Sequence, residues 1–175
     1  MSGKLTLQAL RDVPPGGLVQ FLWDFHRDQM QQENFRSHDD CRRFNQSFPR
    51  GIQLFEAVDT FHGEIQNGGI RQYICNTTGM PDPNPHAFRQ VNEAIEALRV
   101  IGATESGDLL SQVIDLFTRH GWPPDLERQW IELSPDDEAF LDRIENTLFE
   151  TEAAERDYDL LEKYLRKHLD DCVVV

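Results

Sequence analysis

Two adjacent glycines, Gly68-Gly69, interrupt a stretch that otherwise has helical periodicity, and they constrain the fold more than any other feature of the chain. Glycine adopts positive φ at no steric cost, so it is common just past the end of a helix. Apolar residues recur at helical spacing on both sides: Phe55, Val58, Phe61 and Ile65 before the pair, and Ile70, Tyr73 and Ile74 after it. We therefore predict a helix that ends at this pair and a second helix that begins within one or two residues, forming a sharp corner.

Helical spacing continues through most of the remaining chain, and strand-like alternation is almost absent. Clusters such as Pro14-Pro15-Gly16-Gly17 and Gly121-Trp122-Pro123-Pro124 mark turns between the helical stretches. We predict an all-α fold, a single compact domain over residues 1–175 with about seven to nine helices. Three apolar stripes support this: Leu18, Leu22, Phe25 and Met30; Val91, Ile95, Leu98 and Ile101; and Leu109, Val113, Leu116 and Phe117.

The composition favours a cytoplasmic protein. No run of the ~20 apolar residues that span a membrane occurs, and residues 1–10 lack the basic and apolar regions of a signal peptide. Cys41, Cys75 and Cys172 are isolated, without Cys-x-x-Cys spacing, which argues against a disulfide framework and a zinc site. We expect no membrane association, no metal and no cofactor.

The acidic charge is large and unevenly placed. Of the net −14, residues 125–175 carry −10, because they hold 16 acidic and 6 basic side chains. Such acidity repels nucleic acids and membranes and attracts basic partners, so direct nucleic-acid binding is not expected. An acidic surface also keeps a protein soluble, which is the simpler interpretation.

The acidic residues of this region follow helical spacing. Ser134 is a predicted N-cap with Pro135 at the first helical position, so the acids of the first turn have a structural explanation. One helical row reaches about a third of the charge density of duplex DNA, so imitation of DNA requires several rows or a dimer. The candidate partner-binding residues are Asp136, Asp137, Glu138, Asp142, Glu145, Glu152, Glu155, Asp159 and Glu162.

The residues around the glycine pair resemble a known family. Their order is Glu64, Asn67-Gly68-Gly69, Ile70, Gln72-Tyr73 and Asn76-Thr77-Thr78-Gly79. This order is similar to the hallmark of the bacterial DMP-type family, for DNA-mimic protein, in which an acidic residue precedes Asn-Gly-Gly, Gln-Tyr/Phe and Asn-Ser/Thr-Ser/Thr-Gly. Val100-Ile101-Gly102-Ala103 and Tyr164-Leu165-Arg166-Lys167-His168 resemble two later family segments. The resemblance covers roughly residues 45–170, which leaves residues 1–44 as an N-terminal helical extension.

The resemblance implies a function in binding rather than catalysis. It implies that the acidic surface occupies the DNA-binding face of a basic DNA-binding protein, such as a transcription regulator, and that the chain forms a homodimer. We expect the motif residues to be mainly structural, because amides at a turn usually satisfy backbone groups that the turn leaves open; the motif residues are Glu64, Asn67, Gly68, Gly69, Gln72, Tyr73, Asn76 and Gly79.

Catalytic patterns are weak or incomplete. His62-Gly63-Glu64 has the His-x-Glu spacing of zinc deaminases, but the required Pro-Cys-x-x-Cys is missing. Cys75 could act as a nucleophile with His62, although a buried inert thiol is the better interpretation. No phosphate loop, dinucleotide fingerprint or nucleophile elbow occurs, so we do not predict an enzyme.

Two alternatives stay open. The same acidic surface suits an immunity-type neutraliser of a basic toxin or nuclease, which the sequence does not distinguish from a DNA mimic. Alternatively, the Asn67-Gly68-Gly69 corner forms a small-ligand module or an enzyme. Its pocket would be lined by Glu64, Asn67, Gln72, Tyr73 and Asn76.

Overall fold

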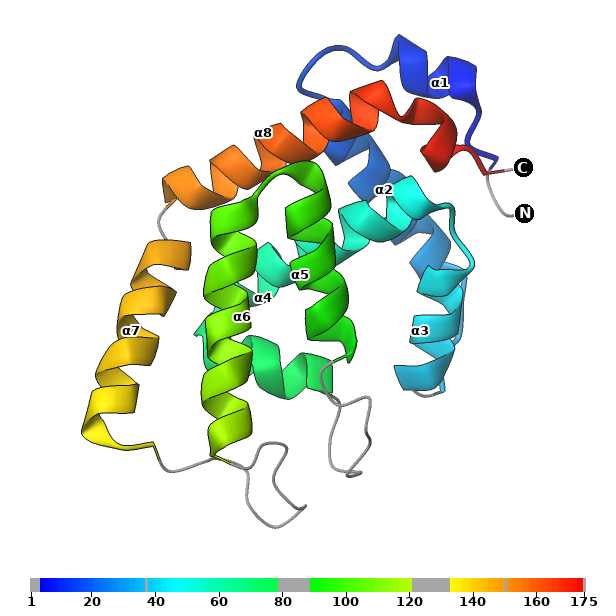
Figure 1. Ribbon diagram of the computed structural model, residues 1–175. Helices are drawn as coiled ribbons and strands as arrows, with labels where there is room; N and C mark the ends of the chain where they lie inside the picture. The colour runs from blue at the N-terminus through cyan, green and yellow to red at the C-terminus, as the bar shows by residue number, and fades with distance from the viewer. Residues whose placement is uncertain (1–3, 37, 79–88, 121–132, 150, 175) are drawn as a thin grey trace. The chain divides into compact units, whose positions relative to one another are not determined.

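The computed structural model describes residues 4–36, 38–78, 89–120, 133–149 and 151–174 (Figure 1). These residues form eight α-helices and one short 3-10 helix, with a single antiparallel bridge between Leu5 and Val174. The predicted all-α class and the number of helices are confirmed. The helices are α1 (Leu7–Asp12), α2 (Leu18–Gln31), α3 (His38–Gln46), α4 (Arg50–Thr78), α5 (Arg89–Ile101), α6 (Thr104–Arg119), α7 (Pro135–Phe149), α8 (Thr151–Lys167) and η1 (Leu169–Cys172).

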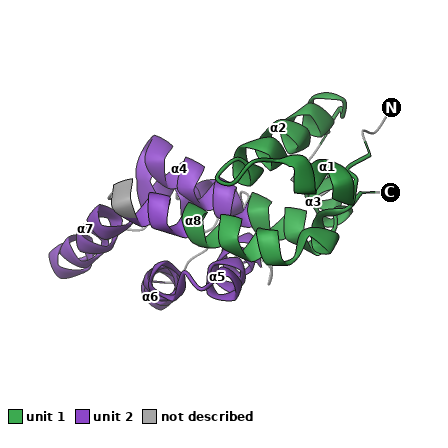
Figure 2. Cartoon of the chain, turned by 90° about the horizontal axis from the view of Figure 1, so that it is seen from above, with its two compact units in different colours: residues 1–56, 158–175 green, residues 57–157 purple. Residues whose placement is uncertain are grey.

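The chain divides into two compact units (Figure 2). Unit 1 combines Met1–Glu56 with Tyr158–Val175, and unit 2 is the continuous segment Ala57–Asp157. Helices α4 and α8 each contribute residues to both units. The predicted domain limits, with residues 1–44 as an extension, stay a prediction.

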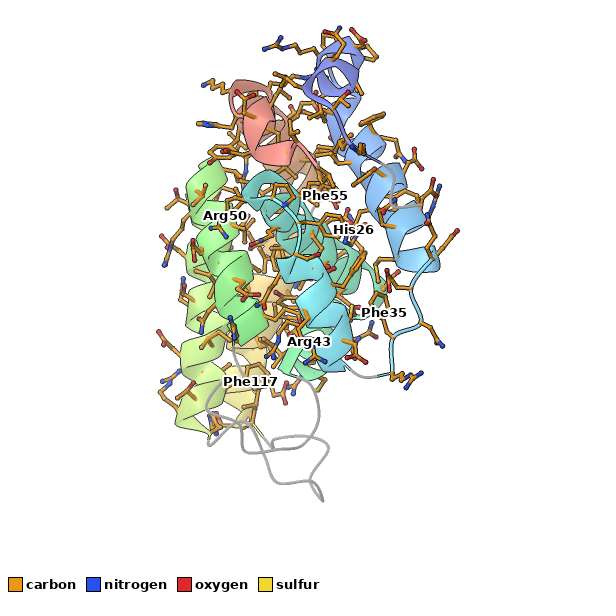
Figure 3. All side chains as sticks on the ribbon, turned by 90° about the vertical axis from the view of Figure 1, so that its right-hand side faces the viewer. His26, Phe35, Arg43, Arg50, Phe55 and Phe117 are labelled. Carbon is orange, nitrogen blue, oxygen red and sulfur yellow. The ribbon has the colours of Figure 1, made fainter. Side chains whose placement is uncertain are left out.

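Unit 1 is built around a cluster of aromatic rings. His26 of α2 is almost fully buried and points toward Phe55 of α4 (Figure 3), with ring centroids 6.5 Å apart. Phe48 lies closer, at 5.4 Å. The Asn45 amide donates to Glu56 at 2.6 Å, so its oxygen faces His26 Nε2 at 3.1 Å. Because an amide oxygen only accepts, this contact requires a proton on His26 Nε2.

The two ends of the chain meet within unit 1. Leu5 and Val174 exchange two backbone hydrogen bonds, of 3.1 and 2.9 Å. The start of α4 also approaches η1 closely, because a Cβ built on Gly51 lies 2.4 Å from Cys172 Sγ. A side chain at position 51 therefore requires the η1 segment to move.

Unit 2 contains a helical hairpin of α5 and α6, which lie side by side and antiparallel (Figure 1). Gly102 makes the turn with φ of +92°, and the Ala103 N–H donates to the Leu98 carbonyl at 2.8 Å. This is the glycine-terminated helix end that the sequence pattern favours. Helix α7 contacts α6, and its predicted apolar stripe, Leu141, Ile144 and Leu148, is buried.

Candidate functional site

The predicted corner lies within α4. The backbone leaves helical geometry at Gly69, with φ of 78° and ψ of −178°. We call residues 57–68 the first arm, residues 70–78 the second arm, and residues 67–71 the corner. The predicted break at the glycine pair is confirmed, and it falls on the second glycine.

Glu64 connects the two arms. Its carboxylate Oε2 accepts hydrogen bonds from Gln72 Nε2 at 3.1 Å and from Asn76 Nδ2 at 2.7 Å. Gln72 lies over Gly68, where a Cβ would fall 1.8 Å from its Oε1 atom. The three polar motif residues therefore satisfy one another across the bend.

The remaining motif residues have different environments. Tyr73 is fully buried and packs edge-on against Phe61, with centroids 5.4 Å apart. Asn67 is exposed, and its side chain forms no hydrogen bond within the described part of the chain. Gly79 lies outside the described residues.

Glu145 of α7 caps the second arm. Its Oε2 atom accepts a hydrogen bond from the Ile70 N–H at 2.9 Å. A Cβ on Gly69 would lie 2.7 Å from the same oxygen, so only glycine leaves room for the carboxylate. A negative charge at a helix N-terminus is favourable because unpaired N–H groups and the helix dipole meet there.

A second acidic residue of α7 reaches the corner. Glu138 forms an ion pair with Arg71, the second residue of the second arm. Glu138 and Glu145 are seven residues apart, which is about two helical turns. Helix α7 therefore contacts the corner through two carboxylates on one face.

Asp137 stabilises the start of α7. Its N–H donates to Ser134 Oγ at 3.2 Å, and Ser134 Oγ donates to Asp137 Oδ2 at 2.6 Å. The predicted N-cap is confirmed, since α7 begins at Pro135. The Ser134 hydrogen bond, assisted by His120 at 3.1 Å, lowers the pKa of Asp137 below its usual value.

Glu162 caps a helix in unit 1. Its carboxylate accepts from the Gly16 and Val19 N–H groups, each at 3.1 Å, at the start of α2. Arg166 pairs with Glu162 at 2.8 Å and donates to the Val13 carbonyl. The side chain of Glu162 is 14% exposed, so this residue serves the fold of unit 1.

Four predicted acidic residues remain free. Each is exposed and has no hydrogen bond or ion pair to another described residue. Glu152 belongs to α8, but its side chain lies outside the described part of the structure. The free carboxylates, which we call the free acidic set, are Asp136, Asp142 and Glu155 of unit 2 and Asp159 of unit 1.

The sequence reasoning missed a buried pair in unit 2. His62 Nε2 lies 3.2 Å from Asp157 Oδ2, and the two side chains are 1% and 0% exposed. Arg156 also contacts Asp157, at 3.3 Å, and Glu105, at 2.6 Å. Asp157 lies four residues after the buried Ala153, on the apolar face of its helix. This spacing was the signal in the sequence that could have predicted its burial. A pair this buried is out of reach of a substrate in solution.

The surroundings of the three cysteines disfavour their thiolate forms, because burial raises the pKa of each thiol. Burial raises the pKa of the half-buried Cys75 thiol, and the nearby Arg71 only partly opposes this. The thiolate is the nucleophilic form, so this cysteine is not activated. Among the described residues, no three His, Cys, Asp or Glu side chains group as a metal site. No helix in that part of the chain is long and apolar enough to cross a membrane.

A comparison with protein families gives one match. The model described as DMP19-like protein matches residues 46–168. This region contains the corner, α7 and the free acidic set. No curated protein and no solved structure matches the chain.

Proposed function

Since the chain belongs to the DMP19-like protein family, we propose that it is an acidic, non-enzymatic binding protein of the cytoplasm. Its surface would occupy the DNA-binding face of a basic DNA-binding protein, such as a transcription regulator, and so compete with DNA. The net charge of −14 supports a basic partner and opposes direct contact with nucleic acid.

The free acidic set is the observation that carries this proposal. Asp136 and Asp142 of α7, together with Glu155 and Asp159 of α8, have no basic partner within the described residues. Their charges are therefore available to an incoming lysine or arginine. Glu138, Glu145 and Glu162 bind groups of this chain instead, so they are poor choices for a first test.

The geometry favours a structural role for the corner over ligand binding or catalysis there. The carboxylate of Glu64 is hydrogen-bonded to Gln72 and Asn76, so these polar groups satisfy each other rather than converge on an open space. This supports a structural role for the motif and gives no support to the small-ligand alternative.

The spacing of the free carboxylates supports a homodimer. Asp136 and Asp142 are six residues apart, about 9 Å along α7. Duplex DNA carries one charge per roughly 1.7 Å of its axis. We therefore propose that a second copy of the chain supplies further carboxylates to the same surface.

The first experiment is affinity capture from the native host's lysate, washed at rising salt. A captured protein would be purified, and its binding measured with and without competing duplex DNA. Retention at low salt, loss at high salt and displacement by DNA are the expected results. Capture of a nuclease or toxin instead would support the neutraliser alternative.

A charge-matched comparison then tests the surface. The test variant combines Asp136→Asn, Asp142→Asn, Glu155→Gln and Asp159→Asn. The control removes the same charge from exposed sites before the family match, by Asp12→Asn, Asp24→Asn, Asp28→Asn and Glu33→Gln. We expect the test variant to lose at least about tenfold in affinity, roughly 1.4 kcal/mol, and the control to bind like the parent. Equal losses would mean that only net charge matters, and unchanged binding in both would refute this surface.

A further inference from the structure

We infer that the corner competes with the basic partner for two carboxylates of α7, so that partner binding and corner integrity are coupled. This inference rests on the proposed function, because it concerns how the acidic surface is regulated. Arg71 and the Ile70 N–H compete with the partner for these carboxylates and do not themselves contact the partner.

The competition follows from the spacing of three acidic residues. Glu138, Asp142 and Glu145 are four and three residues apart, so they share one face of α7. Asp142 is exposed and unpaired within the described residues. Its two neighbours on that face are held by Arg71 and by the Ile70 N–H. The corner thus occupies two of the three carboxylates that a basic partner could contact, one by an ion pair and one by a hydrogen bond.

One of the two contacts, the ion pair of Arg71 with Glu138, is accessible to an incoming cation. The side chains of Arg71 and Glu138 are 25% and 44% exposed, so solvent reaches this pair. Arg71 also has the chemistry of the proposed partner, since it is a guanidinium bound to a carboxylate. An arginine or lysine of the partner can take its place by the same kind of interaction.

Release of the two carboxylates need not undock α7. The helix is held by Leu141, Ile144 and Leu148, which are 2–4% exposed. Burial of these apolar side chains outweighs a solvent-exposed ion pair. The glutamate side chains can therefore turn toward a partner while the helix stays packed.

Coupling of this kind is reciprocal. If the partner draws Glu138 and Glu145 away, it weakens the corner, and a weakened corner raises the affinity for the partner. Residues that never touch the partner, Gly69 and Arg71, then control the strength of binding.

The first test uses a fluorescein-labelled 20-residue oligolysine as the probe. Arg71→Ala is compared with Arg27→Ala, which removes the same charge from an exposed ion pair with Asp24 in unit 1. We expect Arg71→Ala to bind the probe about two- to fivefold more tightly than this control, as the strength of exposed pairs suggests. Equal affinities of the two variants would overturn the inference.

The second test needs no variant and therefore does not depend on a mutant that folds. Amide hydrogen exchange of Ile70 is followed by NMR while oligolysine is added to the parent protein. Exchange should accelerate as Glu145 leaves the Ile70 N–H. A purely structural corner would leave this rate unchanged, and that result would overturn the inference.

The free acidic set separates failure of this inference from failure of the proposed function. If the four-residue variant binds oligolysine like the parent, the acidic surface itself is wrong. If that variant loses binding while the Ile70 amide never responds in the parent, the surface stands and only the competition is refuted.

Discussion

Gly69 meets two separate requirements at one position. Its φ of 78° belongs to the left-handed region, and its missing Cβ leaves room for the Glu145 carboxylate. Gly102 has a similar φ of 92°, but nothing lies within 4 Å of its built Cβ. A comparison of substitutions at the two glycines therefore separates the cost of backbone strain from the cost of losing the Glu145 contact.

We predict that Gly69→Ala destabilises the protein by about 2–4 kcal/mol, because it adds backbone strain and displaces a charged cap. Gly102→Ala should cost only about 1–2 kcal/mol, from strain alone. Urea unfolding measures both free energies. If the two variants lose the same stability, the Glu145 contact does not contribute.

Within the motif, Glu64 matters more than Asn67. Glu64 accepts two amide hydrogen bonds, whereas Asn67 is exposed and makes none among the described residues. We predict that Glu64→Ala lowers the unfolding free energy by about 1–2 kcal/mol, while Asn67→Ala changes it by less than about 0.5 kcal/mol. Thermal and urea unfolding measure the loss of stability in each of the two variants. A large loss in Asn67→Ala would show that its side chain has a role beyond the contacts described.

Asp137 provides a test of pH dependence. Its pKa is lowered chiefly by the Ser134 hydrogen bond and less by His120. A depressed folded-state pKa means that the stabilisation is present above the unfolded-state pKa, about 3.9. It is lost as the pH falls through the lower folded-state value. In Ser134→Ala, the Asp137 pKa should rise toward its ordinary value, which carboxyl NMR titration measures. An unchanged pKa would assign the shift to another cause.

At the level of helices, the N-terminal ends of two helical segments share a glycine pair and a carboxylate supplied by a distant helix. Gly16-Gly17-Leu18-Val19-Gln20-Phe21 begins α2, and Gly68-Gly69-Ile70-Arg71-Gln72-Tyr73 begins the second arm of α4. The glycine with positive φ is the first of its pair at Gly16 and the second at Gly69, and each start receives a glutamate from a distant helix. A glycine at a helix start has no side chain to cap it, so a distant carboxylate does so. The shared Gly-Gly-Leu/Ile-x-Gln-Phe/Tyr pattern is the sequence signal that was overlooked.

Glu162 should therefore resemble Glu145 in importance. We predict that Glu162→Ala costs about 2–3 kcal/mol, because the Val19 N–H of α2, the Gly16 N–H just before it and the guanidinium of Arg166 lose a charged partner. Glu155→Ala, one exposed member of the free acidic set, should stay within about 0.5 kcal/mol of the parent. Urea unfolding of the two variants provides the comparison. Similar losses would contradict the assignment of Glu162 as a cap.

The sequence predicted local features well and distant contacts poorly. The break at Gly69 and the N-cap at Ser134 were predictable, because both depend on backbone preferences within a few residues. The roles of Glu145 and Glu162 were not, because each binds an N–H group 75 or more residues away in the chain. Helical spacing shows which residues share a face, but not what lies opposite that face.

For the whole molecule, net charge overstates the surface available to a partner. The excess of acid in residues 125–175 includes caps at Glu145 and Glu162 and the buried Asp157. These side chains also stabilise the fold, so the net charge of this region is larger than the charge that is free of contacts within the chain. The free acidic set is what remains for recognition, and the proposed function depends on it.

Residues 1–44 precede the family match, yet they supply much of the interior of unit 1. Leu10, Leu18 and Leu22 have no exposed surface. We predict that a chain of residues 45–175 loses cooperative unfolding or becomes insoluble, because its unit 1 lacks these buried side chains. Circular dichroism melting of the truncated chain tests this. A sharp melting transition near that of the parent would show that the segment is a dispensable extension.

The split of unit 1 along the chain also sets an order for folding during synthesis. Residues 57–157 are continuous, so unit 2 has all of its parts as soon as Asp157 is made. Unit 1 must wait for residues 158–175, which bring the Glu162 cap for α2 and Val174 for the bridge to Leu5. The first helices to leave the ribosome are thus among the last to be completed. Until then, the helices of residues 1–56 lack the C-terminal residues with which they form unit 1.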